Sequence, residues 1–142
     1  MILLDTTILA YAVGSDHPLR EPCRRLLQSG REGRTQLATS VEVIQEFVHV
    51  HSRRRPRETT VALARDYLVA LDVLTTSPDD LALGLALFVQ HPELGAFDAV
   101  LAGFALNRKV QALVSADGAF GQVRDLHWID PATPALDAWL GS

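Results

Sequence analysis

The sequence has few of the features that mark secreted, membrane-bound and nucleotide-dependent proteins. Its single cysteine, Cys23, excludes an intrachain disulfide and suits a reducing cytoplasm. The first residues carry no basic segment ahead of a long apolar run, so we expect no secretory signal. The longest apolar run, residues 81–89, is shorter than the roughly 20 residues that cross a bilayer. No glycine-rich phosphate loop is present, which argues against an enzyme that uses nucleoside triphosphates. We therefore expect a cytoplasmic protein without a membrane segment.

Charge is unevenly spread along the 142 residues. The net charge of -4 excludes the strongly basic class of nucleic-acid binders. Nine of the 13 basic residues lie in the two stretches 20–34 and 53–57, so the rest of the chain is acidic. An acidic pocket beside basic patches is compatible with a metal-dependent nuclease, in which cations offset the repulsion of phosphate. An ordinary solvated surface would give the same pattern.

Apolar residues alternate between short buried runs and segments with helical periodicity. Strands are predicted at 2–4, 36–40, 73–76, 112–115 and 126–129, and helices at 18–29, 41–54, 57–71, 78–90 and 97–107, with a short helix in the tail 131–142. Strands that alternate with helices predict an α/β fold with a parallel sheet of four or five strands between helices. We expect one domain over residues 1–142, with the helices from 41 to 71 forming a hairpin.

Two aspartates follow predicted strands. Asp5 comes directly after the first strand, and Asp117 comes just after the strand at 112–115. Ligands of open parallel sheets bind at the carboxyl ends of the strands, so both residues are candidates for one site. Aspartate is also a common turn and cap residue, which is the alternative for each of them.

Two further acids lie on predicted helices. Asp98 is the one charged residue of the apolar segment 97–106, and a carboxylate on a buried helix needs a partner. It also lies in the first turn, so a simple N-terminal cap is the alternative to a metal ligand. Glu46 borders the apolar half of the helix at 41–54, where it either points toward a strand end or is solvated.

The four acids Asp5, Glu46, Asp98 and Asp117 have no basic neighbour in sequence. If the fold gathers them at one sheet edge, their mutual repulsion calls for a hard divalent cation. Oxygen ligands suit Mg²⁺, with Mn²⁺ as the alternative. Such a site is equipped for metal-assisted hydrolysis of phosphodiesters.

These acids lie in four blocks that resemble the PIN-domain family. Residues 2–11 are similar to its opening, where the first strand ends in Asp-Thr or Asp-Ser. The second to fourth blocks are residues 43–50, 96–105 and 113–120, the last with a Ser-x-Asp-x-x-Phe pattern. The blocks occur in the family's order over nearly the whole chain, and the compact length is most like that of VapC-type toxins. The resemblance implies a PIN-like three-layer α/β domain.

The resemblance also implies a Mg²⁺-dependent endoribonuclease, the toxin of a bacterial toxin–antitoxin pair. Asp5 and Asp98 would be direct metal ligands, Asp117 would complete the site, and Glu46 would hold or deprotonate the attacking water. The products would carry a 5′-phosphate and a 3′-hydroxyl. Thr6 and Ser115 would support the carboxylates as hydrogen-bond donors. The implied partners are RNA, a small antitoxin and a second copy of the chain.

One residue departs from the family pattern, and one basic run has no assigned role. Thr7 stands where the family often has Asn, which weakens a supporting contact without removing a ligand. Arg53, Arg54 and Arg55 are candidate contacts for RNA or antitoxin, or a solvated turn.

Three other functions stay open at this point. A receiver-like domain usually has paired acids early and a lysine late, whereas the one lysine here, Lys109, precedes the last strand. A phosphatase-like domain would have Asp-x-Asp where this chain has Asp5-Thr-Thr7. A PIN scaffold that binds proteins without catalysis is the third alternative.

Overall fold

The computed structural model describes residues 1–140, which form a five-stranded parallel sheet in the order β3-β2-β1-β4-β5. The strands are β1 (Ile2–Leu4), β2 (Leu37–Ser40), β3 (Asp72–Leu74), β4 (Ala112–Val114) and β5 (Trp128–Ile129). Every neighbouring pair is parallel, with Leu4 of β1 opposite Val114 of β4. The predicted α/β fold is confirmed, because parallel strands need the helical crossovers that the sequence pattern predicts.

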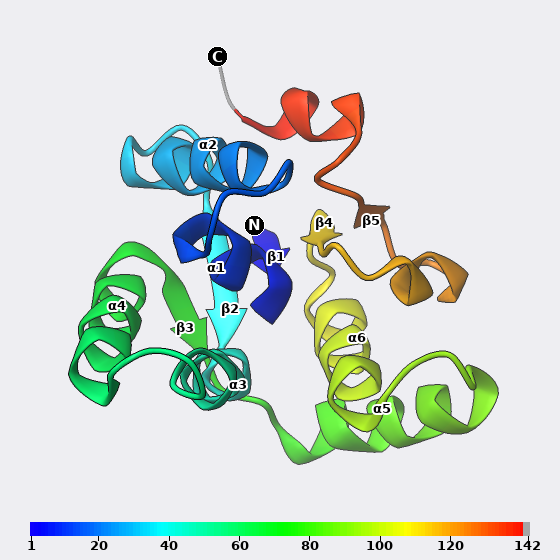
Figure 1. The fold of residues 1–142 in the computed structure, drawn as a ribbon. Helices are drawn as coiled ribbons and strands as arrows, with labels where there is room; N and C mark the ends of the chain where they lie inside the picture. The colour runs from blue at the N-terminus through cyan, green and yellow to red at the C-terminus, as the bar shows by residue number, and fades with distance from the viewer. Residues whose placement is uncertain (141–142) are drawn as a thin grey trace.

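Helices lie around this sheet, as Figure 1 shows. Within residues 1–140 they are α1 (Thr6–Val13), α2 (Arg20–Arg31), α3 (Val41–His51), α4 (Arg57–Ala70), α5 (Pro78–Gln90) and α6 (Ala96–Arg108), with 3₁₀ helices η1 (Gly118–Gln122) and η2 (Pro134–Trp139). Two of them, α1 and η1, were not predicted from the sequence. No helix in this part of the chain is both long and apolar enough to cross a membrane.

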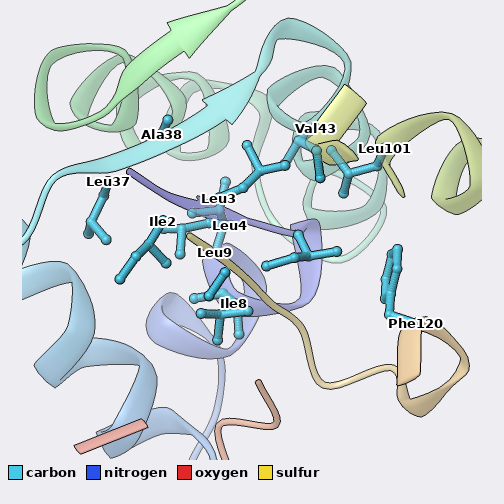
Figure 2. Close-up of a cluster of buried hydrophobic side chains, with 14 of the residues drawn as sticks. Ile2, Leu3, Leu4, Ile8, Leu9, Leu37, Ala38, Val43, Leu101 and Phe120 are labelled. Carbon is cyan, nitrogen blue, oxygen red and sulfur yellow. The ribbon is translucent and has the colours of Figure 1, made fainter. Parts of the chain in front are cut away.

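The core is built on β1 and the helix that follows it. Leu3 and Leu4 of β1 and Ile8 and Leu9 of α1 are fully buried. Figure 2 shows them in one cluster. Central strands that are apolar on both faces are expected where helices cover both sides of a parallel sheet. The backbone N–H of Asp5 donates a 3.1 Å hydrogen bond to the carbonyl of Val114, which extends the pairing of β1 with β4 by one residue. The sheet therefore fixes the backbone of Asp5 at the candidate site.

The helices α3 and α4 form the predicted hairpin and pack against α1. Ser40 caps α3 by accepting a 3.2 Å hydrogen bond from Val43 N–H. Tyr67 of α4 is buried, contacts the ring of Phe47 edge-on, and donates a 2.7 Å hydrogen bond to the carbonyl of Leu9. This contact ties the hairpin to the helix that begins beside Asp5.

The helices α5 and α6 approach each other closely at two glycines. A Cβ on Gly84 would lie 2.5 Å from Val100 Cα, and one on Gly103 would lie 2.7 Å from Asp80 O and from Gly84 N. The buried Asp80 carboxylate then joins the two helices, because it accepts hydrogen bonds from Ser77 N–H, Asn107 and Arg108. The pair is therefore held at both glycine contacts and at one ionic contact.

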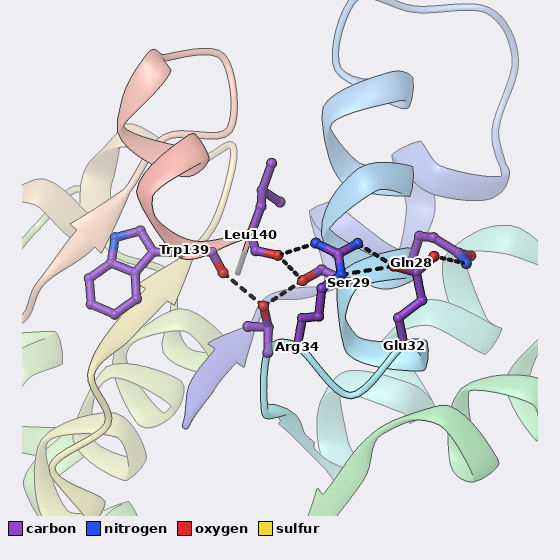
Figure 3. Close-up of polar contacts among 7 residues, drawn as sticks. Gln28, Ser29, Glu32, Arg34, Trp139 and Leu140 are labelled. Atoms are coloured by element: carbon purple, nitrogen blue, oxygen red, sulfur yellow. Dashed lines mark hydrogen bonds and ion pairs between the residues drawn. The ribbon is translucent and has the colours of Figure 1, made fainter. Parts of the chain in front are cut away.

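The chain end that follows β5 is fastened to the end of α2. Thr35 donates a 2.8 Å hydrogen bond to the carbonyl of Trp139, and Arg34 donates one of 2.8 Å to the carbonyl of Leu140. Ser29 also contacts the carbonyl of Leu140, as Figure 3 shows. The predicted tail helix exists as η2, and residues 141–142 of that prediction lie outside the described residues.

Candidate active site

Asp5 lies at the carboxyl end of β1 and is almost fully buried. One carboxylate oxygen, Oδ2, accepts hydrogen bonds of 2.6 Å from Ser115 and 3.1 Å from Thr7. Burial raises the pKa of Asp5 above its usual value, and the hydrogen bonds from Ser115, the Thr6 amide and Thr7 only partly offset it. The side chain is thus fixed in direction, and no positive charge from the described residues 1–140 is among the groups that shift its pKa.

Glu46 accepts a hydrogen bond from a threonine of α1. Thr6, the first residue of α1, donates a 2.8 Å hydrogen bond from Oγ1 to Glu46 Oε2. Glu46 is half-buried on α3, which starts directly after β2 and so brings this helix face to the same sheet edge. Thr6 thus contacts Glu46, and Ser115 contacts Asp5, while the supporting role of these two residues at a metal site stays a prediction.

Asp117 lies slightly further from its strand than the sequence suggests, because β4 ends at Val114. Its N–H donates a 3.0 Å hydrogen bond to Ser115 Oγ, and its Oδ1 accepts 2.9 Å from Ala119 N–H at the start of η1. This hydrogen bond fixes one oxygen of the Asp117 carboxylate at the start of η1.

Asp98 interacts electrostatically with the carboxyl groups of the other three acids. Burial raises the pKa of Asp98 most, and the neighbouring carboxyls of Asp5, Asp117 and Glu46 raise it further, to about 7. Hydrogen bonding between the carboxyl groups of Asp98 and Asp117 is one of the causes of this rise. Gly95, and not Asp98, is the N-cap residue of α6. The fold therefore gathers all four acids predicted from the sequence at one sheet edge.

The donor set of this cluster suits a hard cation. The groups are carboxylates in partly desolvated positions, and the charged residues that shift the Asp98 pKa are themselves all acidic. Across residues 1–140, however, no group of three or more His, Cys, Asp or Glu side chains is placed to hold a metal ion. These two observations agree for Mg²⁺, which binds through one or two carboxylates and completes its shell with water and phosphate.

A pocket of about 480 Å³ opens beside the cluster, between α3, the start of α5 and the start of α6. Its wall includes Asp5, Glu46 and Asp98, so three of the four acids border this pocket. Figure 2 labels two of its apolar wall residues, Val43 of α3 and Leu101 of α6.

Four residues near the cluster were not among the predicted site residues, although the sequence marks Thr7 as a weakened supporting contact. Thr7 donates to Asp5 and accepts a 3.0 Å hydrogen bond from Ala116 N–H, so it ties β1 to the loop after β4. Glu42, Thr76 and Phe97 line the pocket. The exposed Phe97 precedes Asp98, and its position before a candidate acid is the one sequence signal that points to it.

The arginine run lies elsewhere. Arg53, Arg54 and Arg55 are exposed in the turn between α3 and α4, where Arg53 contacts the His49 ring at 2.9 Å. None of the three is among the residues that line the acidic pocket.

The order of the acids and the sheet that gathers them match a known family. The family model described as "PIN domain" matches residues 2–126. The chain belongs to the PIN-domain family. This assignment replaces the receiver-like and phosphatase-like alternatives, and it agrees with the resemblance of the four sequence blocks.

Relatives of this PIN-domain chain cover nearly its whole length. Ribonuclease VapC7 of Mycobacterium tuberculosis is 42% identical, and the match covers 99% of both proteins. Ribonuclease VapC23 of the same species is 35% identical over 69% of this chain and 78% of its own. The sequence relationship thus places the chain with the VapC group.

Solved structures share the fold at low sequence identity. VapC20 of Mycobacterium tuberculosis, described as a Sarcin-Ricin loop cleaving toxin, has a TM-score of 0.73 at 21% identity and covers 85% of this chain and 93% of its own. VapBC2 from Rickettsia felis, bound to a promoter DNA fragment, has a TM-score of 0.71 at 20% identity and covers 91% and 98%. These likenesses show the fold alone.

Proposed function

We propose that this chain is a Mg²⁺-dependent endoribonuclease and the toxin of a toxin–antitoxin pair. The observation that carries the proposal is the convergence of four acids from β1, α3, α6 and the loop after β4. Burial, together with the carboxyls of Asp5, Asp117 and Glu46, raises the pKa of Asp98 to about 7. A cluster that costs this much electrostatic free energy is explained by a cation that neutralises it. The name of the relative VapC7 adds RNA as the substrate class.

Asp5 and Asp98 would hold Mg²⁺ directly, and Asp117 would complete the site directly or through a water. Mn²⁺ would fit the same oxygen donors. When bound, the cation polarises a phosphoryl oxygen and lowers the pKa of bound water. Asp5 suits the ligand role because Ser115 and Thr7 fix its carboxylate, and supporting donors of this kind typically orient a metal ligand.

Glu46 is the proposed base. Thr6 holds one of its oxygens at 2.8 Å, which leaves the carboxylate oriented at the pocket wall. In this role Glu46 accepts a proton from the water that attacks phosphorus in line. The bond from phosphorus to the 3′-oxygen breaks, so one product ends in a 3′-hydroxyl and the other begins with a 5′-phosphate.

The proposed partners are a small antitoxin and a second copy of the chain. One structural neighbour is described as a toxin–antitoxin complex from Klebsiella pneumoniae. Arg53, Arg54 and Arg55 form an exposed basic turn that fits an acidic antitoxin segment by charge. A homodimer is supported by exposed apolar side chains on α5, where Leu85, Phe88 and Val89 are 55%, 46% and 81% exposed. The lone, buried Cys23 agrees with a cytoplasmic site of action.

The test is cleavage of a labelled total-RNA pool by the purified chain, with Mg²⁺ or with EDTA, followed by mapping of the cut ends. We expect discrete cuts with Mg²⁺, with 5′-phosphate and 3′-hydroxyl ends, and none with EDTA. Cleavage that persists in EDTA would contradict the metal mechanism. A folded chain that binds an antitoxin but cuts no RNA would support the scaffold alternative.

A further inference from the structure

The pocket beside the acid cluster is lined by side chains that the proposed cleavage chemistry does not use. Its volume of about 480 Å³ lies within the range of roughly 300–1,000 Å³ that is usual for small-ligand sites. Apart from the three acids of the cluster, its wall has an apolar part made mainly of Val43, Pro78, Leu81, Phe97, Val100 and Leu101. A site that handled phosphate alone would have no need of this apolar wall.

Phe97 is the aromatic member of that wall. Its side chain is 72% exposed, whereas Ala99 and Leu101 in the first turns of α6 are buried. Phe97 and Asp98 line the same pocket, so a flat ligand stacked on the Phe97 ring would lie near the proposed cation ligand. Unpaired nucleobases stack on exposed aromatic rings in this way, and such stacking tolerates any base.

Glu42 supplies a polar contact in the same wall. Its carboxylate is half-buried, and Oε2 accepts a 2.8 Å hydrogen bond from Thr76 Oγ1, which follows β3. A carboxylate held in this way repels phosphate and accepts hydrogen bonds only from N–H or O–H donors. The ligand that fits this part of the pocket is therefore a neutral group with donors on its edge.

We propose that this pocket binds one unpaired nucleobase of the RNA next to the scissile phosphate, with the base stacked on Phe97 and its edge donating to Glu42. The inference rests on the proposed ribonuclease function and assigns that site a base preference. Guanine is the base selected, because its N1–H and N2–H donors lie side by side and match the two oxygens of a carboxylate. Adenine and cytosine place a ring-nitrogen acceptor beside their amino group, and uracil flanks its single N–H with carbonyl oxygens that the carboxylate repels.

Free nucleosides test the pocket without cleavage, since they carry no phosphate for the acid cluster to repel. Guanosine, inosine and uridine would be titrated into the ¹⁵N-labelled protein. We expect saturable shifts of amides around Phe97 and Glu42 with guanosine, at least about tenfold weaker binding of uridine, and intermediate binding of inosine, which lacks the N2 amino group. Equal responses to the three nucleosides, or no response, would overturn the proposal.

The RNA pool supplies the second readout. Wild-type cut sites should be enriched in guanine at one fixed position beside the cut. Glu42→Gln should weaken that enrichment, because it replaces one of the two acceptor oxygens that guanine needs with an NH₂ donor. Phe97→Ala should lower kcat/KM about tenfold or more, whereas Phe97→Trp should retain it. The exposed Glu58→Gln and Val69→Ala are the matched controls and should behave as wild type.

The outcomes separate the two proposals. RNA cleavage with an unchanged base preference in Glu42→Gln and Phe97→Ala would overturn the base pocket and leave the nuclease standing. Guanosine binding without any RNA cleavage would support the base pocket and overturn the nuclease proposal. If Phe97→Ala changes the sedimentation of the protein and not its base preference, the surface is a contact between copies and the base pocket is wrong.

Discussion

Ser115 and Asp5 are joined by a 2.6 Å hydrogen bond across 110 positions of sequence. The same Ser115 oxygen accepts the N–H of Asp117 at 3.0 Å. One buried hydroxyl therefore sets the direction of one candidate ligand and the path of the backbone that carries another.

Replacing Ser115 with alanine should affect stability and cation binding together. The Asp5 carboxylate loses its shortest hydrogen bond and the Asp117 N–H loses its acceptor, so the free energy of unfolding should fall by about 1–3 kcal/mol. Affinity for Mn²⁺, measured calorimetrically, should fall about 10- to 100-fold. Ser15→Ala, on the exposed loop after α1, is the control. Unchanged cation affinity in a folded Ser115→Ala protein would contradict the supporting role.

Asp80 should make stability depend on pH in the acid range. Burial raises the pKa of Asp80, but hydrogen bonds from Ser77, Asn107 and Arg108 outweigh this and lower it to about 2. The folded pKa lies below the unfolded value, so the ionised group stabilises the protein above about pH 4. That contribution, about 2 kcal/mol, is lost as pH falls toward 2.

The measurement compares urea unfolding of wild type and Asp80→Asn between pH 6 and pH 3. We expect the variant to be less stable at pH 6, with a gap that narrows as the pH falls. The exposed neighbour in the same helical turn, Asp79→Asn, should show no such gap. A gap that stays constant with pH would mean that the charge of Asp80 is not what joins α5 to α6.

Gly103→Ala should destabilise the protein, although alanine is normally favoured over glycine in a helix by about 1 kcal/mol. The added Cβ would lie 2.7 Å from backbone atoms of Asp80 and Gly84, which cannot move without separating α5 and α6. We expect a net loss of about 1–3 kcal/mol in thermal or urea unfolding. Gly95→Ala, whose Cβ meets nothing within 4 Å, should cost less than about 1 kcal/mol. A more stable Gly103→Ala protein would contradict the packing described.

Much of the site could be predicted because its acids occupy positions with strong physical constraints. Asp5 ends a buried strand, and Asp98 is the single charge on an apolar helix, where it needs a partner. For Glu46 the sequence showed only that it borders the apolar half of helix α3. Its contact with Thr6 depends on how β2 and α1 are placed by the sheet, which periodicity does not report.

The parts that the sequence did not predict are set by tertiary contacts. The helix α1 begins directly after Asp5 with two threonines, which have low intrinsic helix propensity, and its formation depends on burial of Ile8 and Leu9. The role of Thr7 arises from a hydrogen bond to the loop after β4, 109 positions away. Local sequence patterns carry no information on contacts between residues so far apart in the chain.

The central claim is that Asp98 is a ligand of a catalytic cation, and Asp98→Asn tests it most directly. At pH 8 the wild-type carboxylate is ionised against three other acids, so the variant should melt at the same temperature as wild type or higher. Its cleavage of labelled RNA in Mg²⁺ should nevertheless fall by about 10²- to 10⁴-fold, since a bound cation stabilises the transition state by several kcal/mol. The exposed Asp79→Asn should cut as wild type does. A folded Asp98→Asn protein that cuts RNA at the wild-type rate would contradict the account.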